Sequence, residues 1–284
     1  MIRTSRQLKA LVRNLSKGNS TKAQLIIRNY AMERFIERIS ISRYNSRVII
    51  KGGVLIAAMI GLDNRSTMDV DATIKGIDLT VENVRLIIDE IKAVKLNDGV
   101  HFEIKSIERI MDEADYYGIR VSLETVLETM RTPLKVDFST GDVITPHEIS
   151  FPYKLMFEER TIPILAYNLE TLLAEKLETL LSRGVANTRM RDFYDIFAIT
   201  STEMPAINDE TLRQAFAATV ERRGSVAVTS DVEFTLDECE VDSGMIALWG
   251  NYQRKFGYAS QVTWEMVMQS VRRLVSRIDL VKVR

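Results

Sequence analysis

The chain contains 284 residues, of which 27% are charged, and its 38 Lys and Arg residues almost balance its 39 Asp and Glu residues. This length suits one large domain or two smaller ones. The single cysteine, Cys239, excludes an internal disulfide framework, and two histidines are too few for a His-rich metal site. The sequence contains no apolar run of about 18 residues and no signal-peptide pattern after Met1, so we expect a cytoplasmic protein without a membrane partner.

The charges are unevenly distributed along the chain. Residues 1–51 contain 12 basic and 2 acidic residues, and residues 251–284 contain 7 basic and 2 acidic residues, whereas residues 52–250 between them are acidic. Basic ends favour a polyanionic partner, and an acidic middle favours a cation site. Solvent-exposed helix faces are the alternative interpretation of the same pattern.

The predicted elements, taken in chain order, divide the sequence into two halves. Helices are predicted over residues 4–14, 20–40, 54–61 and 80–95, and strands over 47–51, 68–74, 101–107, 118–123 and 133–139. Asp98-Gly99 predicts a hairpin turn, Pro146, Pro152 and Pro163 predict an irregular connection, and further helices are predicted over 168–182, 190–200, 209–223 and 260–279. We therefore expect an α+β protein, with a sheet and flanking helices in residues 1–165 and a mainly helical domain in residues 166–284.

The helix predicted over residues 20–40 is amphipathic. Its apolar side contains Leu25, Ile26, Tyr30, Phe35, Ile36 and Ile39, and its other side contains Arg28, Glu33, Arg34, Glu37 and Arg38. The charged side supplies part of the positive charge of the first 51 residues, so it is a candidate contact for a polyanion.

Two glycines, Gly52 and Gly53, follow Lys51 at the junction of a predicted strand and a predicted helix. Glycines at such a junction allow the backbone to approach a ligand closely, and the N–H groups at a helix N-terminus suit a phosphate. A tight turn without a ligand is the alternative interpretation.

Asp69 and Asp71 lie two residues apart in a predicted strand, so both side chains point to one face and Val70 points to the other. Two carboxylates on one face repel each other unless a cation or solvent intervenes. Pairs of carboxylates, together with substrate phosphates, are the ligands that Mg²⁺ prefers. An exposed strand face is the alternative interpretation of this pair.

A third carboxylate, Asp137, lies in the middle of the strand predicted over 133–139, where aspartate is disfavoured. If that strand lies beside the strand of Asp69 and Asp71, the three carboxylates converge and can hold two metal ions for phosphoryl transfer. Asp137 would then polarise the incoming hydroxyl. The alternative is an aspartate on an edge strand that faces water.

Two basic residues, Lys176 and Arg183, are one heptad apart and share one flank of the helix predicted over 168–182. A lysine suits a phosphate as a compact charge, and an arginine adds two N–H donors. Asp192, in the next predicted helix, can orient Lys176 or Arg191 or support a metal ligand. The alternatives are a lysine packed along a helix edge and an aspartate that caps a helix.

Several of these motifs together resemble one known family. Gly52-Gly53, a gap of fifteen residues, Asp69-Val70-Asp71 and the later Asp137 resemble the nucleotidyltransferase superfamily pattern. The segments Lys51–Ile56, Gly61–Asp71, Ala174–Gly184 and Arg189–Ile196 are similar to the AbiEii/AbiGii toxin family, in the family's order and within residues 20–200. The gap is longer than the general superfamily spacing and close to that of this family, whereas residues 201–284 carry no recognisable motif.

The resemblance implies a nucleotidyltransferase-like mixed sheet and the toxin of a bacterial toxin–antitoxin or abortive-infection operon. It implies Mg²⁺ as the cofactor, an NTP as the substrate and an AbiEi-type antitoxin, encoded by a neighbouring gene, as a partner. The implied metal ligands are Asp69, Asp71 and Asp137, which are also catalytic residues together with Lys176 and Asp192 of the later motifs. The implied nucleotide-binding residues are Lys51, Gly52, Gly53, Arg65, Ser66, Thr67, Lys176 and Arg183.

Some relatives of the family add nucleotides to the acceptor end of tRNA and thereby block translation. We therefore hypothesise transfer of a nucleotide from an NTP to an RNA hydroxyl, with the tRNA 3′ end as the expected acceptor and the basic helix 20–40 on the RNA backbone. Two alternatives are an NTP-dependent modification of a protein hydroxyl and a non-catalytic module that binds nucleotide or nucleic acid.

Overall fold

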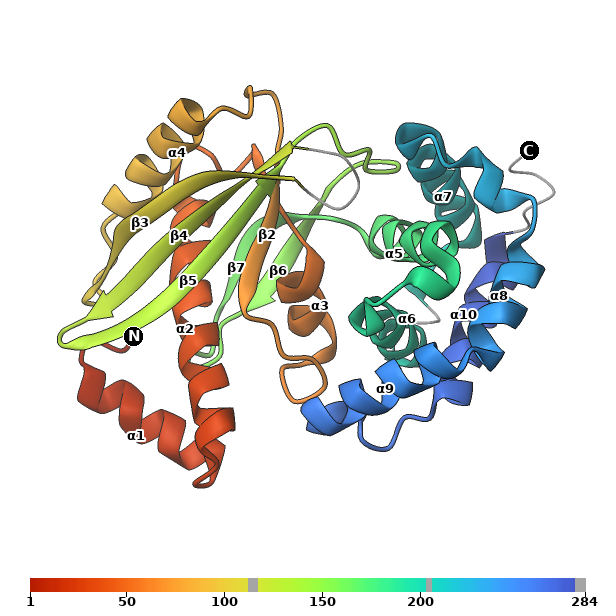
Figure 1. The fold of residues 1–284 in the computed structure, drawn as a ribbon. Helices are drawn as coiled ribbons and strands as arrows, with labels where there is room; N and C mark the ends of the chain where they lie inside the picture. Colours follow the sequence, from red (N-terminus) through yellow and green to blue (C-terminus); the bar gives the residue numbers. More distant parts are fainter. Residues whose placement is uncertain (112–116, 203–205, 279–284) are drawn as a thin grey trace. The chain divides into compact units, whose positions relative to one another are not determined.

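The computed structural model describes residues 1–111, 117–202 and 206–278. Within these residues, seven strands form one mixed sheet in the order β3-β4-β5-β2-β1-β7-β6 (Figure 1). The strands are β1 (Val48–Lys51), β2 (Asp69–Ile74), β3 (Val100–Met111), β4 (Tyr117–Leu127), β5 (Met130–Ser139), β6 (Ile149–Lys154) and β7 (Thr161–Ala166). The pairs β2–β5 and β1–β7 are parallel, and the other neighbouring pairs are antiparallel.

Contacts divide the chain into two units. The strand-rich unit comprises Met1–Ala58, Ser66–Asp142 and Ile149–Ala166, and the helical unit comprises Met59–Arg65, Val143–Glu148 and Tyr167–Arg284. The first four helices are α1 (Ser5–Ser16), α2 (Ser20–Ile41), α3 (Gly52–Ile60) and α4 (Val81–Ala93). The later helices are α5 (Leu169–Arg183), α6 (Met190–Thr202), α7 (Asp209–Arg223), α8 (Val232–Val241), α9 (Ser243–Lys255) and α10 (Trp264–Ile278). The predicted α+β fold class, with a mixed sheet first and helices after it, is confirmed, and the domain boundary at residue 165 stays a prediction.

One face of the sheet is apolar because side chains alternate between the two faces of each strand. The buried side chains of this face include Ile50, Val70, Ala72, Val136 and Phe138. Helix α2 covers the face (Figure 1). Its Phe35 packs against Phe102 of β3 with ring centroids 5.4 Å apart. The residues between the apolar ones, among them Asp69 and Asp71, therefore face the opposite side of the sheet.

The segment predicted as an irregular connection forms the β6–β7 hairpin, so that prediction was wrong. Pro152 and Pro163 lie opposite each other in this hairpin. Proline is tolerated there because β6 is the edge strand, and β7 pairs with β1 through Ala166, beyond Pro163. The prolines therefore did not mark the ends of strands here, because the pairing of β6 with β7 runs through both of them.

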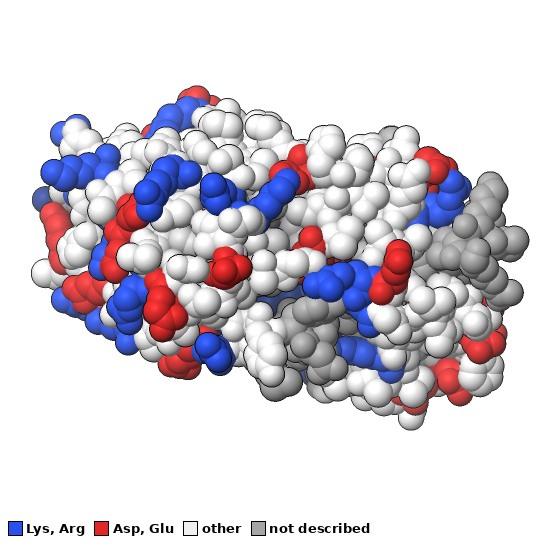
Figure 2. All heavy atoms as spheres, turned by 90° about the horizontal axis from the view of Figure 1, so that it is seen from above, with Lys and Arg blue, Asp and Glu red and all other residues white. Residues whose placement is uncertain are grey.

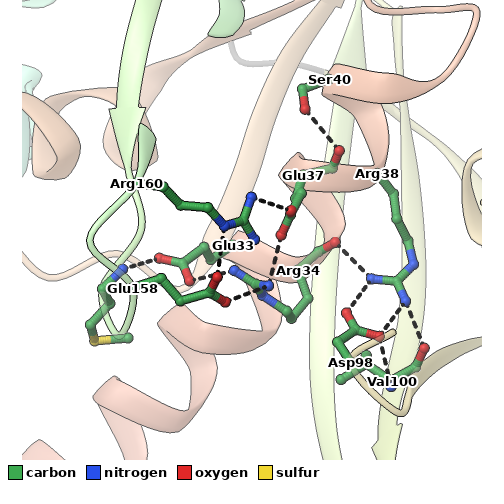
Figure 3. Close-up of polar contacts among 10 residues, drawn as sticks. Glu33, Arg34, Glu37, Arg38, Ser40, Asp98, Val100, Glu158 and Arg160 are labelled. Carbon is green, nitrogen blue, oxygen red and sulfur yellow. Dashed lines mark hydrogen bonds and ion pairs between the residues drawn. The ribbon is translucent and has the colours of Figure 1, made fainter. Parts of the chain in front are cut away.

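The hairpin turn predicted at Asp98-Gly99 was also wrong, because these residues join α4 to β3 and Asp98 is fully buried. Its carboxylate accepts two hydrogen bonds from the guanidinium of Arg38 on α2, each 2.9 Å long. Arg38 also donates to the carbonyl oxygen of Val100 at 2.7 Å (Figure 3). The pair thus fixes α2 to the start of β3.

A second buried network lies one turn earlier on α2 (Figure 3). The guanidinium of Arg34 is fully buried and contacts Glu33 at 2.8 Å and Glu37 at 2.7 Å. Arg160, which follows the turn of the β6–β7 hairpin, contacts Glu37 at 2.7 Å and Glu158 at 2.7 Å. The network therefore fixes α2 to that hairpin.

These two networks change the interpretation of the basic N-terminal segment. The charged side predicted for helix 20–40 is largely buried, so Arg34 and Arg38 cannot contact an RNA backbone in this structure. Exposed basic residues of the same segment lie instead on α1, at Arg6, Lys9 and Arg13. On the strand-rich part that Figure 2 shows from above, Lys and Arg lie among Asp and Glu, and not in a separate basic area.

In the helical unit, aromatic packing holds α6 in place. Phe193 packs against Trp264 of α10 with ring centroids 5.1 Å apart. The hydroxyl of Tyr194 donates to the carbonyl oxygen of Asn64 at 2.6 Å. These contacts fix the helix that carries Asp192 and Asp195. Across both units, none of the helices in the described ranges is long and apolar enough to cross a membrane.

The buried Arg38–Asp98 pair gives a test of how α2 is anchored. We expect Arg38→Ala to reduce the free energy of unfolding by about 3–5 kcal/mol, because it leaves the buried Asp98 carboxylate without a counter-charge. Arg43→Ala is the matched control, since Arg43 pairs with Glu90 at the surface with 69% of its side chain exposed and should change the stability very little. Urea denaturation followed by circular dichroism measures both, and similar small losses for the two variants would contradict the expectation.

Candidate active site

Three aspartates come together on one face of two neighbouring strands. Asp69 and Asp71 lie on β2, whose intervening residue Val70 is buried in the apolar core. The parallel pairing of β2 with β5 places Asp71 opposite Asp137 and Asp69 opposite Lys135. The strand that carries Asp137 therefore lies beside the strand of the Asp-x-Asp motif, as the convergence of carboxylates requires.

The residues opposite one another on neighbouring strands form a row across the sheet, and this row ends in a basic residue on each side. Lys51 of β1 lies opposite Asp71, and Arg120 of β4 lies opposite Asp137. The row therefore reads Lys51, Asp71, Asp137, Arg120 across four neighbouring strands. Two carboxylates lie in the middle of the row and one basic residue lies at each end.

Gly52 allows the chain to pass directly over Asp71 at the start of α3. Its φ of +63° lies in the left-handed region, and a Cβ atom at this position would lie 2.2 Å from Oδ2 of Asp71. The next residue, Gly53, directs its backbone N–H at the same oxygen over 3.4 Å. Any other residue at position 52 would therefore collide with the Asp71 carboxylate.

Asp137 is held by an arginine in this structure. Arg120 donates from Nε to Oδ1 of Asp137 at 2.8 Å and from Nη2 to Oδ2 at 2.6 Å. Among the residues with described positions, no group of three or more His, Cys, Asp or Glu side chains is arranged to hold a metal ion. The predicted third metal ligand is thus engaged with Arg120, while Asp69 and Asp71 form a carboxylate pair beside it.

A fourth carboxylate, Asp142, is a partner of Lys51 that the sequence analysis missed. Its Oδ2 lies 2.6 Å from Nζ of Lys51 and accepts hydrogen bonds from the hydroxyls of Ser139 and Thr73. Burial alone would raise the pKa of Asp142, but Lys51 and these hydroxyls lower it to about 2. Asp142 therefore stays ionised and positions Lys51 at the end of the row.

The electrostatics of the Asp-x-Asp pair differ from those of Asp142. Burial above all, and also Asp137 and Asp69, raise the pKa of Asp71, Lys51 and the Gly53 N–H lower it, and the result is a value of about 6. Burial and the neighbouring Asp137 also raise the pKa of Asp69. Both carboxylates thus carry negative charge that the surrounding residues do not fully balance, which is the condition that a bound cation relieves.

The later motif residues form a buried ion-pair cluster within the helical unit. Nζ of Lys176 on α5 lies 2.6 Å from Asp192 and 2.8 Å from Asp195, both on α6. Burial lowers the pKa of Lys176, but the two carboxylates outweigh burial and raise it. Arg65 donates to Asp195 at 2.6 and 3.1 Å, and this arginine and Lys176 lower the pKa of Asp195 to about 2 against the effect of burial. Lys176 is therefore held as a cation.

The remaining predicted nucleotide-binding residues have other surroundings. Arg65 is buried with its guanidinium on Asp195, Ser66 and Thr67 are buried, and Arg183 is half-buried at the end of α5. The hydroxyl of Thr67 donates to the carbonyl oxygen of Asp69 at 3.2 Å, so Thr67 supports the start of β2. Nucleotide binding by these four residues stays a prediction, and none of the steps proposed below uses them.

Arg120, Asp142 and Asp195 are site residues that the prediction did not include. Asp195 follows Asp192 at a helical spacing of three, which was a usable signal for a shared face. Arg120 and Asp142 carried no comparable signal, because their partners Asp137 and Lys51 lie 17 and 91 residues away in the sequence.

The comparison with known families settles what kind of protein this is. The sequence profile described as "Nucleotidyl transferase AbiEii toxin, Type IV TA system" matches residues 34–270, most of the chain. The chain belongs to the AbiEii nucleotidyltransferase toxin family. Membership in this type IV toxin–antitoxin family implies an antitoxin as a partner and an NTP as a substrate.

Solved structures show the same fold. The MenT4 nucleotidyltransferase toxin from Mycobacterium tuberculosis is 15% identical, with a TM-score of 0.56 over 97% of this chain and 99% of the other. The protein JHP933 from Helicobacter pylori is 12% identical, with a TM-score of 0.51 over 91% of this chain and 95% of the other. No curated protein sequence matches the chain.

The pKa of Asp71 predicts how the metal-free protein responds to pH. Because its folded-state value of about 6 exceeds the ordinary 3.8, the stability that Asp71 contributes is present below pH 3.8 and is lost as the pH rises through 6. In EDTA at about pH 7.5, Asp71→Asn should raise the free energy of unfolding by about 1–3 kcal/mol, and the gain should shrink at about pH 4.5.

Asp195→Asn is a control with the opposite expected effect, because the pKa of Asp195 is lowered and its carboxylate pairs with two cations in the wild type. It should reduce the stability at about pH 7.5. Denaturant unfolding at both pH values measures the two variants. A loss of stability in Asp71→Asn at neutral pH would show that the carboxylate has a structural role.

Proposed function

We propose that this AbiEii family member transfers a nucleotide from an NTP to a hydroxyl of an RNA acceptor, the 3′ end of tRNA, and thereby blocks translation. The carboxylate row on β2 and β5, with Gly52 and Gly53 beside it, is the observation that supports nucleotidyl transfer most directly. In that reaction the acceptor hydroxyl attacks the α-phosphate of the NTP, a new P–O bond forms, and pyrophosphate leaves.

The donor set of the row fits a magnesium ion. Asp69 and Asp71 present carboxylate oxygens on one strand face, and Mg²⁺ needs only one or two carboxylates when it also binds substrate phosphates. The raised pKa values of both residues support the proposal, because a bound cation would balance their negative charge. We therefore propose Asp69 and Asp71 as metal ligands, with Asp137 completing the set, and the ion when bound would stabilise negative charge on the phosphates.

The protein residues around the row are suited to the other parts of the reaction. Gly52 lets the chain pass over Asp71, so that α3 begins beside this carboxylate, and the N–H groups at the start of the helix suit a phosphate. Asp137 would polarise the acceptor hydroxyl once Arg120 releases it. Lys176, held as a cation by Asp192 and Asp195, would bind phosphate and stabilise the leaving pyrophosphate, as the family motif implies.

The proposal that RNA is the acceptor draws on the exposed basic residues of α1. Arg6, Lys9 and Arg13 are exposed on this helix, while its Leu8 and Val12 are buried. A row of basic side chains on one helix is suited to a phosphate backbone. We therefore assign the RNA contact to α1 in place of the charged side of α2, which is buried.

Label transfer from NTPs tests the proposed function. We expect the wild-type protein with Mg²⁺, each of four radiolabelled NTPs in turn and total tRNA to label tRNA. Asp71→Asn should reduce this transfer by about 10²-fold or more, because catalysis of this kind is mostly positioning and electrostatic stabilisation. Asp89→Asn, which removes an exposed aspartate paired with Lys92 on α4, is the matched control and should keep wild-type activity.

Absence of transfer with every NTP, or unchanged transfer by Asp71→Asn, would contradict the proposed function. A parallel reaction with protein acceptors separates the main rival, NTP-dependent modification of a protein hydroxyl, because the carboxylate row defines only the donor side. A non-catalytic binding module would instead leave toxicity in cells intact when Asp69 or Asp71 is replaced by alanine.

A further inference from the structure

We propose that Arg120 is the counter-cation of Asp137 in the metal-free protein and competes with a divalent cation for that carboxylate. This proposal rests on the proposed function, because it takes Asp69, Asp71 and Asp137 as the metal-binding carboxylates. It assigns to Arg120 a positioning role: the arginine holds the third carboxylate until the cation arrives.

The geometry of the pair supports direct competition. Arg120 engages both oxygens of Asp137, at 2.8 and 2.6 Å, so a metal ion at either oxygen would share it with the guanidinium and be repelled by its positive charge. Strand pairing makes the contact local, because Arg120 lies directly opposite Asp137 on the antiparallel neighbour β4. Asp71 lies opposite Asp137 on the other side, so the same carboxylate faces the arginine and the proposed metal ligand.

The exposure of the two side chains allows a cation to replace Arg120 at Asp137. The Arg120 side chain is 37% exposed and the Asp137 side chain is 21% exposed, so the arginine can rotate into solvent while the carboxylate stays in place. Arg120 thus stabilises the Asp137 carboxylate when no cation is bound, and its release accompanies binding.

Arg131 provides a matched control for the loss of one positive charge. It also lies on this sheet, pairs with Glu124 at 2.7 Å and Glu103 at 3.2 Å, and is 53% exposed. It is six residues from Asp137 along β5, which corresponds to about 20 Å. At this separation and at moderate salt, its charge is screened from the carboxylates on which Arg120 acts.

The test is a titration of the full chain, without nucleotide, with Mn²⁺ as the probe, by isothermal calorimetry at moderate salt. We expect Arg120→Gln to bind Mn²⁺ about tenfold more tightly than the wild type, because a carboxylate is released and a nearby positive charge is removed. Arg120→Lys keeps the charge but not the bidentate contact, so its Mn²⁺ affinity should lie between those of the wild type and Arg120→Gln. Arg131→Gln should bind like the wild type.

A double variant separates local competition from a general charge effect. In the Asp137→Asn background, Arg120→Gln should tighten Mn²⁺ binding far less than it does with Asp137 present. Unchanged or weaker binding by Arg120→Gln, an equal gain in Arg131→Gln, a full gain without Asp137, or no binding by any of the proteins would overturn the proposal. Circular dichroism of each variant excludes misfolding as the cause.

Failure of the proposed role of Arg120 can be distinguished from failure of the proposed function. Label transfer to tRNA by the wild type, together with Mn²⁺ affinity that does not respond to Arg120→Gln, would overturn the role of Arg120 alone. Tighter Mn²⁺ binding by Arg120→Gln without label transfer to any acceptor would support the competition and overturn the proposed reaction.

Discussion

The parallel pairing of β2 with β5 is the constraint on which the candidate site depends. It places Asp71 opposite Asp137, and the outer pairings of the same strands add Lys51 and Arg120 at the two ends of the row. A shift of one residue in the register would turn these side chains toward the apolar face that α2 covers. Val70, Val136 and the other buried residues of that face therefore fix the register, and the register brings the charged residues together.

A second feature of the molecule is that its buried basic side chains are paired directly with carboxylates. Arg34 and Arg38 are buried with carboxylate partners in the strand-rich unit. In the helical unit, Arg65 is buried against Asp195, and the largely buried Lys176 contacts the same carboxylate. The net charge of −1 thus describes a chain in which many charges are paired internally. Asp69 and Asp71 differ from these pairs, since their pKa values are raised, and this difference supports the proposal that they bind an additional cation.

Much of the fold and part of the site could be predicted from the sequence. Periodicity located the strands and the shared face of Asp69 and Asp71, because both depend on neighbours within a few residues. The burial of Arg38 could not be predicted, since Asp98, its partner, comes from a turn 60 residues later in the chain. Arg120 was missed for the same reason, because its partner depends on the register between β4 and β5. Helices α8 and α9 were missed in a segment where no apolar period was recognised.

A crystal structure of the full chain with Mn²⁺ and a non-hydrolysable NTP analogue tests the central claim most directly, namely that the aspartates of β2 form the catalytic centre. We expect an anomalous peak for Mn²⁺ between the carboxylates of Asp69 and Asp71, with the triphosphate of the analogue beside Gly53 at the start of α3. A metal ion and a nucleotide bound away from both aspartates would contradict the claim.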